Sequence, residues 1–87
     1  MSYRLIVKPS AEKDVERLPR PVQRRVPDRL TRIQGDPRAP GSVKLAGAKR
    51  TYRVRVGDWR IVYEIDDERR IVYVTIVAHR REVYRGL

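Results

Sequence analysis

Arginine side chains gather in residues 51–64, where alternating β-forming residues predict a hairpin. With Gly57-Asp58 as a two-residue turn, the predicted register places Arg55 directly opposite Arg60, and Arg53 lies on the same face. Like charges facing each other across strands destabilise a sheet by about 0.2–1 kcal/mol per pair. A cluster that weakens the sheet indicates a function, and for guanidinium groups we expect that function to be phosphate binding.

The opposite face of the predicted hairpin is apolar. It carries Tyr52, Val54, Val56, Trp59, Ile61 and Tyr63. These side chains need a covering layer, so we interpret the aromatic residues as core and not as a platform for stacking bases.

Composition supports a polyanionic partner. The chain has 87 residues and a formal net charge of +10, and 17 of its 21 basic residues are arginine. Arginine's planar fork suits bidentate phosphate contacts, which favours a nucleic-acid or nucleotide partner. The alternative is a highly charged surface that only keeps the protein in solution.

The same composition narrows the class of protein. The chain contains no cysteine, which excludes disulfides and thiolate metal sites and fits a reducing cytoplasm. The N-terminus lacks the apolar core of a signal peptide, and the longest apolar run, Ile71 to Ala78, is too short to span a membrane. We therefore expect a soluble cytoplasmic protein with one domain, residues 1–87.

Two helices are predicted before the hairpin. Residues 3–7 read as a strand, and Ser10 is placed to cap a helix over 11–18. A second helix is predicted over 21–34, where Pro27 should kink it or restart it near Asp28.

The remaining segments complete an α+β fold. Residues 35–50 are rich in glycine and proline and predict a long loop, and residues 70–78 predict the last strand. The order is β-α-α-β-β-β, with both helices on one face of a mainly antiparallel sheet. This arrangement leaves the arginine-bearing face open and ends in a short basic tail, residues 79–87.

Three segments together resemble the RelE/ParE superfamily of bacterial and archaeal toxins. They are Leu45-Ala46-Gly47, the hairpin from Tyr52 to Tyr63, and the ending from His79 to Tyr84. The resemblance implies a toxin neutralised by a separately encoded antitoxin. RelE-type members cut mRNA in the ribosomal A site, whereas ParE-type members inhibit DNA gyrase.

The resemblance also implies site residues. RelE-like cleavage uses basic residues on the concave sheet face and a tyrosine near the C-terminus, which by position fall on Arg53, Arg55, Arg60, Arg80 and Tyr84. Because all five positions carry compatible side chains, the nuclease branch is favoured. The best-known RelE-like pattern has lysines where this chain has Arg53 and Arg55, and arginine cannot act as a base.

Metal-independent RNA cleavage needs a base for the attacking 2′-hydroxyl, a stabilised phosphorane and a proton for the leaving oxygen. We expect Arg55 and Arg60 to clamp the phosphate beside Arg53, and Arg80 to stabilise the leaving oxygen. We expect Tyr84 to stack on a base or to position the attacking hydroxyl. The base could be His79, Tyr84 or a ribosomal group.

The expected partners follow from this hypothesis. Arg81 is expected to bind RNA together with Arg53, Arg55, Arg60 and Arg80. The ribosome and its mRNA are therefore expected partners. An acidic or amphipathic antitoxin is expected to wrap the helices or to cover the arginines. No cofactor and no metal are expected. The alternatives are a ParE-like gyrase inhibitor and a basic RNA-binding module without catalysis.

Overall fold

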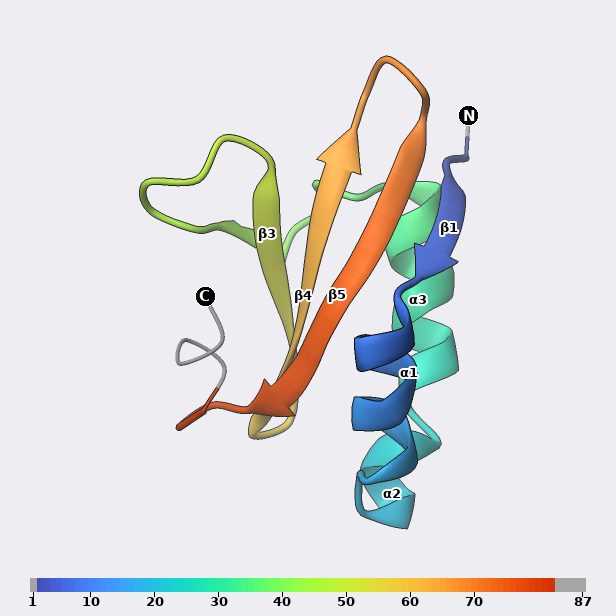
Figure 1. The fold of residues 1–87 in the computed structure, drawn as a ribbon, viewed down its shortest axis with the longest axis vertical. Coiled ribbons are helices and arrows are strands. Elements are labelled where there is room, and N and C mark those ends of the chain that lie inside the picture. The colour runs from blue at the N-terminus through green and yellow to red at the C-terminus, as the bar shows by residue number, and fades with distance from the viewer. Residues whose placement is uncertain (1, 83–87) are drawn as a thin grey trace.

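A computed structural model describes residues 2–82 of the chain and shows a sheet with helices on one side (Figure 1). Its elements, in chain order, are β1 (Arg4–Val7), α1 (Pro9–Glu16), α2 (Arg20–Gln23), α3 (Val26–Gly35), β2 (Val43–Lys44), β3 (Thr51–Val56), β4 (Trp59–Asp66) and β5 (Ile71–His79). The predicted α+β class and the order of its elements are confirmed. Within residues 2–82 no helix is long and apolar enough to cross a membrane.

The sheet has five strands in the order β1-β5-β4-β3-β2. Only β1 and β5 run parallel, and the other neighbours are antiparallel. The register predicted for the hairpin is confirmed at every pair, including Arg55 opposite Arg60. Gly57 opens the turn with φ of 61°, a left-handed conformation that glycine adopts without steric cost.

The predicted helix boundaries need two corrections. Ser10 does not cap the first helix, which begins at Pro9, and its Oγ instead donates a hydrogen bond to the Thr75 carbonyl at 3.1 Å. Proline suits this first position because the helix would leave its missing N–H unpaired anyway. The second predicted helix is two helices, and Pro27 lies in the first turn of α3, so a restart is confirmed slightly earlier than expected.

The segment predicted as a long loop contains the short strand β2, which the prediction missed. Val43 pairs with Arg53, so β2 forms the outer edge of the sheet beside β3. Two contacts fix the start of this segment. The Tyr63 hydroxyl donates to the Pro37 carbonyl at 2.6 Å, and Arg38 binds Asp67 in the turn between β4 and β5.

The core lies between the helices and the sheet. The largest fully buried side chains of this core are those of Tyr63, Ile61, Ile65, Val56, Val72 and Val74. From the helices, Ala11 and Ile33 pack against this cluster, and Trp59 and Tyr52 border it as partly buried residues. The apolar face of the hairpin is therefore core, as its alternation predicts.

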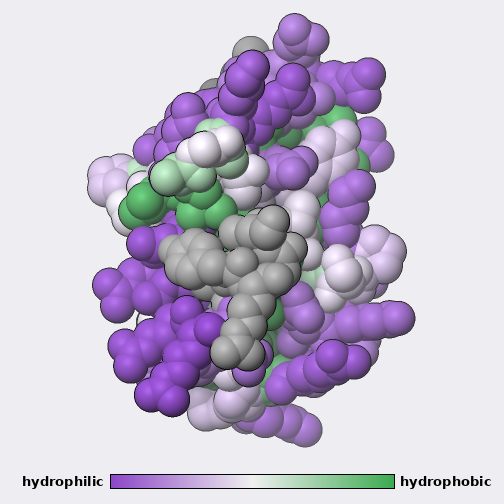
Figure 2. All heavy atoms as spheres, turned by 60° about the vertical axis from the view of Figure 1, so that its left-hand side comes forward, coloured by the Kyte–Doolittle hydropathy of each residue, from purple (hydrophilic) through white to green (hydrophobic). Residues whose placement is uncertain are grey.

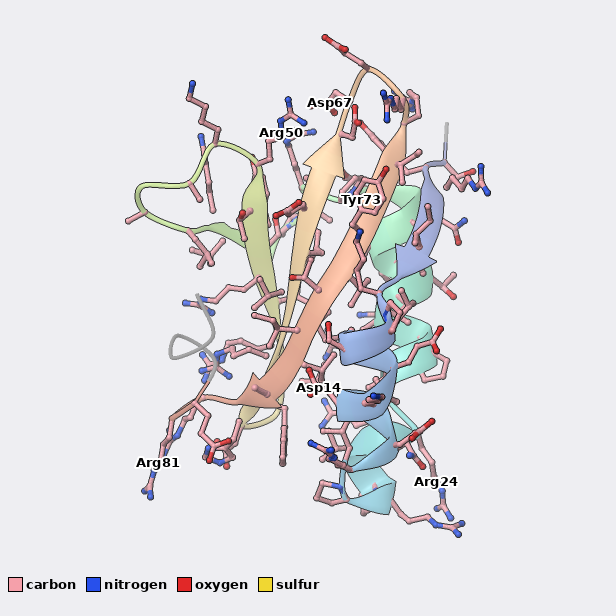
Figure 3. The ribbon with its side chains drawn as sticks, in the orientation of Figure 1. Asp14, Arg24, Arg50, Asp67, Tyr73 and Arg81 are labelled. Atoms are coloured by element: carbon pink, nitrogen blue, oxygen red, sulfur yellow. The ribbon has the colours of Figure 1, made fainter. Side chains whose placement is uncertain are left out.

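A β-bulge interrupts the pairing of β4 with β5. Val62 pairs with Ile76 but Tyr63 pairs with Val74, so Thr75 is an extra residue in β5. The Val77 N–H donates to Asp14 Oδ2 of α1 at 3.0 Å, and Figure 3 shows Asp14 on the helix beside the sheet. Because the bulge shifts the alternation by one, Val77 faces the core and Ala78 lies opposite Arg60.

Candidate active site on the arginine face

The arginine face is the sheet surface opposite the helices, and it carries Arg53, Arg55 and Arg60. Arg55 and Arg60 form a pair without mutual backbone hydrogen bonds, the closer of the two antiparallel pair types, with Cα atoms about 4.5 Å apart. Arg53 is two residues from Arg55, about 7 Å along the strand. Three guanidinium groups thus share a small area.

This face is less open than its sequence predicts. Arg55 is exposed, but Arg60 is only 9% exposed and Val62 is fully buried. Both lie on β4, between β3 and β5, and Val62 has Arg53 on one side and Ile76 on the other. The side chains of Arg53 and Ile76 can cover Val62 on this face even though no helix does.

Arg60 is held against the hairpin turn. Its Nη1 donates to the carbonyls of Gly57 at 3.3 Å and Trp59 at 3.2 Å. These contacts fix the guanidinium beside the turn, while exposed Arg55 on the opposite strand is available to a ligand. The pair therefore combines a guanidinium held by the turn with an exposed one.

The turn also fixes the residues that follow β5. The Arg80 backbone N–H donates to the Asp58 carbonyl at 2.8 Å, and Arg80 Nη1 lies 3.9 Å from Asp58 Oδ1. Arg80 therefore reaches the same end of the sheet as Arg55 and Arg60. Arg81 is exposed at this end (Figure 3).

His79 lies on the other side of the sheet from Arg60. It pairs with Trp59, and the two rings meet edge to face with centroids 5.4 Å apart. Trp59 borders the core, so the imidazole lies at the rim of the apolar face. Its Nδ1 accepts a hydrogen bond from the Arg81 backbone N–H at 3.3 Å. Tyr84, the remaining predicted site residue, lies outside the described residues.

A groove that the sequence reasoning missed adjoins Arg53. It has a volume of about 690 Å³ and is lined by Val43, Lys44, Leu45, Ala46, Gly47, Ala48, Thr51 and Arg53. Val43 is a large hydrophobic residue that is 45% exposed, and Figure 2 shows a small apolar patch among hydrophilic side chains. Leu45-Ala46-Gly47 lies within this groove, but in the sequence it indicated only a resemblance to a known family and not a groove.

Arg53 carries an unusual nitrogen. Among the buried side-chain nitrogens and oxygens of residues 2–82, its Nε has no hydrogen-bond partner. Buried polar atoms in native proteins are nearly always paired, and one without a partner calls for an explanation. A ligand that supplies an acceptor beside Arg53 would provide one.

A second polar cluster lies at the far end of the sheet, around Asp67 (Figure 3). Arg38 donates two hydrogen bonds to Asp67, at 3.0 and 2.7 Å, and one to the Tyr52 hydroxyl at 3.2 Å. The Tyr3 hydroxyl donates to the same carboxylate at 2.8 Å. Hydrogen bonds from Arg38 and Tyr3 lower the pKa of Asp67 to about 2, so this carboxylate stays ionised and unsuited to proton transfer. The cluster anchors the loop after α3.

A cavity of about 280 Å³ lies between α3, that loop and β3. It is lined by Arg29, Arg32, Ile33, Asp36, Ala39, Pro40, Gly41, Ser42, Val54, Arg55 and Tyr63. Burial raises the pKa of Tyr63 to about 12, which keeps its hydroxyl protonated as a donor to Pro37. The hydroxyl of Tyr63, which lines this cavity, is therefore engaged in holding the loop at Pro37. The carboxylate of Asp36 is among the charged groups of the lining.

Comparisons with known proteins agree with this architecture. The family described as ParE toxin of type II toxin–antitoxin systems, parDE, matches residues 5–84. A putative RelE-like toxin protein of Escherichia coli is 30% identical over 82 residues, which cover 92% of this chain and 85% of that protein.

Solved structures of RelE toxins have the same fold as this chain. The free E. coli RelE toxin, in a variant with two arginines replaced by alanine, superposes with a TM-score of 0.82 at 26% identity, covering 97% of this chain and 90% of that one. The RelBE2 toxin–antitoxin complex of Mycobacterium tuberculosis matches with a TM-score of 0.80 at 25% identity, covering 91% of this chain and 99% of that one.

Proposed function

Because the chain belongs to the ParE toxin family of type II toxin–antitoxin systems, and is RelE-like in sequence and structure, we propose that this toxin is a metal-independent endoribonuclease. Its substrate would be mRNA in the ribosomal A site, and its cleavage would inhibit translation. The observation that carries the proposal is the pairing of Arg55 with Arg60 on an otherwise ordinary hairpin. Stability disfavours this pairing, and an RNA phosphate between the two side chains would relieve it.

The proposed reaction is a transesterification. The 2′-oxygen attacks the adjacent phosphorus as its proton leaves, a pentacoordinate phosphorane forms, and the bond to the 5′-oxygen breaks as that oxygen gains a proton. The products are a 2′,3′-cyclic phosphate and a 5′-hydroxyl. Arg55 and Arg53 would bind the non-bridging oxygens, and Arg60, fixed by the turn carbonyls, would add a preorganised charge.

The remaining roles fall to the residues after β5. Arg80 would stabilise the leaving oxygen, Arg81 would bind the RNA backbone, and Tyr84 would stack on a base or position the 2′-hydroxyl. The base would be Tyr84, His79 or a ribosomal group. The contact of His79 with Trp59 favours the other two, since it turns the imidazole away from Arg60.

Cleavage on purified ribosomes tests the proposal. A defined mRNA is translated with the protein, and its 3′ ends are mapped. We expect cuts in the A-site codon with the wild type and with Arg24→Ala, an exposed arginine on the helical side (Figure 3). Arg55→Ala should lose about 10²–10³-fold in rate, the size expected for one charge-stabilising donor. An absence of cuts under conditions where an active ribosome-dependent nuclease toxin cuts would refute the nuclease assignment.

Gyrase inhibition is the second candidate, favoured by the ParE family match over residues 5–84. That activity does not need the arginine cluster as a catalyst. A supercoiling assay with purified gyrase separates the two candidates. Inhibition by the wild type that Arg55→Ala retains, without ribosomal cleavage, would support the ParE-like activity.

A cognate antitoxin is the expected partner, as in the RelBE2 complex of M. tuberculosis and the RelBE complex of E. coli. We propose an acidic or amphipathic antitoxin that wraps the helices or covers the arginine face, in the cytoplasm. Co-expression with the product of a neighbouring small reading frame should yield a stable complex and restore growth. A complex that forms without restoring growth would argue against this partner.

A further inference from the structure

The groove beside Arg53 has the chemistry of a base-binding pocket. We propose that it holds a nucleobase of the mRNA strand next to the cleaved linkage, and so contributes to sequence preference at the cut. This inference rests on the proposed ribonuclease function, because the strand must already be held by the arginines. The proposed occupant of the groove is RNA. Binding of a protein segment in its place is one of the outcomes that the test distinguishes.

The position of the groove places it on the path of such a strand. Val43 of β2 lies opposite Arg53 of β3, so both side chains project from the arginine face. Thr51 also lines the groove and shares this face by alternation. The groove therefore begins where the phosphate-binding cluster ends. With Arg53 and Arg55 about 7 Å apart, a phosphate at Arg55 leaves the neighbouring nucleotide within reach of it.

The lining of the groove fits the two chemical properties of a base. Its floor consists of aliphatic side chains, chiefly those of Val43, Leu45, Ala46 and Ala48, which suit an apolar aromatic face. Its polar contribution includes the buried Nε of Arg53, a donor without a partner. Every nucleobase carries ring nitrogens or carbonyl oxygens at its edge that could accept this hydrogen bond.

The competing occupants satisfy only part of this lining. An aliphatic side chain of a partner would fill the apolar floor but leave the Arg53 Nε without an acceptor. A carboxylate would accept from Arg53 and could pair with Lys44, but it would leave the apolar part of the lining uncovered. A base meets both requirements, and the net charge of +10 favours a nucleic-acid strand on this surface.

Photo-crosslinking on the ribosome tests the proposal directly. The A-site codon of a programmed ribosome carries 4-thiouridine, and the nucleotide at the cut carries a 2′-deoxyribose so that cleavage cannot occur. After irradiation, the crosslinked peptides of the full-length protein are mapped by mass spectrometry. We expect crosslinks within residues 43–48. Ala46→Trp, which fills the groove, should lower their yield about tenfold, the order expected for one lost base contact.

A cleavage assay on unmodified mRNA provides the second readout. Ala46→Trp should change the base preference at the cut, while Arg24→Ala should match the wild type in crosslinks and preference. Should Ala46→Trp fail to fold by circular dichroism, Arg53→Lys serves instead, because it keeps the charge but removes Nε. It should likewise alter the base preference and weaken crosslinking within residues 43–48.

The possible outcomes distinguish a failure of the base pocket from a failure of the proposed ribonuclease function. Normal cuts with crosslinks only outside residues 43–48, or a filled groove with unchanged preference, would overturn the base pocket and leave the nuclease standing. Wild-type protein that neither cuts nor crosslinks would overturn both. Protection of residues 43–48 by the antitoxin but not by ribosome-bound mRNA would assign the groove to the protein partner and refute the proposal.

Discussion

Replacing Arg55 with glutamine should raise stability while it removes activity, whereas the same change at Arg60 should lower both. Arg55 is exposed and lies opposite Arg60, so its removal ends the repulsion across the strands without exposing any core. Arg60 is 9% exposed and donates to the carbonyls of Gly57 and Trp59, contacts that glutamine cannot reproduce.

The expected magnitudes have opposite signs. Relief of a like-charge cross-strand pair is worth about 0.2–1 kcal/mol, which raises the melting temperature of a domain of this size by about 1–8 °C. Loss of hydrogen bonds from a charged donor, as in Arg60→Gln, costs about 1–3 kcal/mol. The repulsion is partly screened by salt, so the advantage of Arg55→Gln should shrink as ionic strength rises.

Urea unfolding at low and high salt measures both effects, with ribosomal cleavage assayed on the same preparations. Arg4→Gln is the matched control, because Arg4 is an exposed strand arginine opposite Ile71 and faces no like charge. A wild type that is more stable than Arg55→Gln at low salt would refute the reasoning. So would a stabilisation of the same size in Arg4→Gln, since cross-strand repulsion could not then be its source.

Three further predictions concern the elements that support the site. Tyr63→Phe removes the buried donor to the loop after α3 and should cost about 1–3 kcal/mol at pH 8. The pKa of Tyr63 is about 12 in the folded state against 10 in the unfolded state. The stabilisation by its hydroxyl is therefore complete below pH 10 and fades as pH rises toward 12. In urea unfolding, the difference in free energy of unfolding between the wild type and Tyr63→Phe should narrow over this range, and a constant difference would contradict this. Asp67→Asn should lower the melting temperature at pH 7. Because the pKa of Asp67 falls from 3.8 to about 2 on folding, this effect should fade as pH drops from about 4 to 2, and an unchanged effect at pH 2 would speak against the Arg38 contact. Asp14→Ala should speed amide hydrogen exchange at Val77, whose N–H donates to that carboxylate, and unchanged protection would exclude this role.

Much of the fold was predictable because local patterns determine it. Strict alternation and a two-residue turn fixed the hairpin, and with it the Arg55–Arg60 pair. Pro27 marked the break between α2 and α3, whereas the first helix begins at Pro9, two residues before its predicted start at Ala11. Residues 45–47 signalled a special loop without indicating the groove beside it.

Other features depend on contacts between distant segments, which a single sequence does not display. The bond from Arg38 to Asp67 joins residues 29 positions apart. The strand β2 is only two residues long, too short for any periodicity. The parallel pairing of β1 with β5 joins the first strand of the chain to the last, and it adds a strand on the far side of β5 from Arg60.

The extra residue in β5 determines which side chains can take part in chemistry. If β5 instead ran through Thr75 in regular alternation, with Thr75 opposite Val62, His79 would be shifted by one position, and its imidazole would emerge on the side of Arg60 instead of beside Trp59. A cluster of guanidinium groups would then gain an imidazole neighbour. The bulge at Thr75 therefore separates a surface of guanidinium groups alone from one that would also carry an imidazole. A change in the pairing of β5, with no new side chain, would convert one into the other.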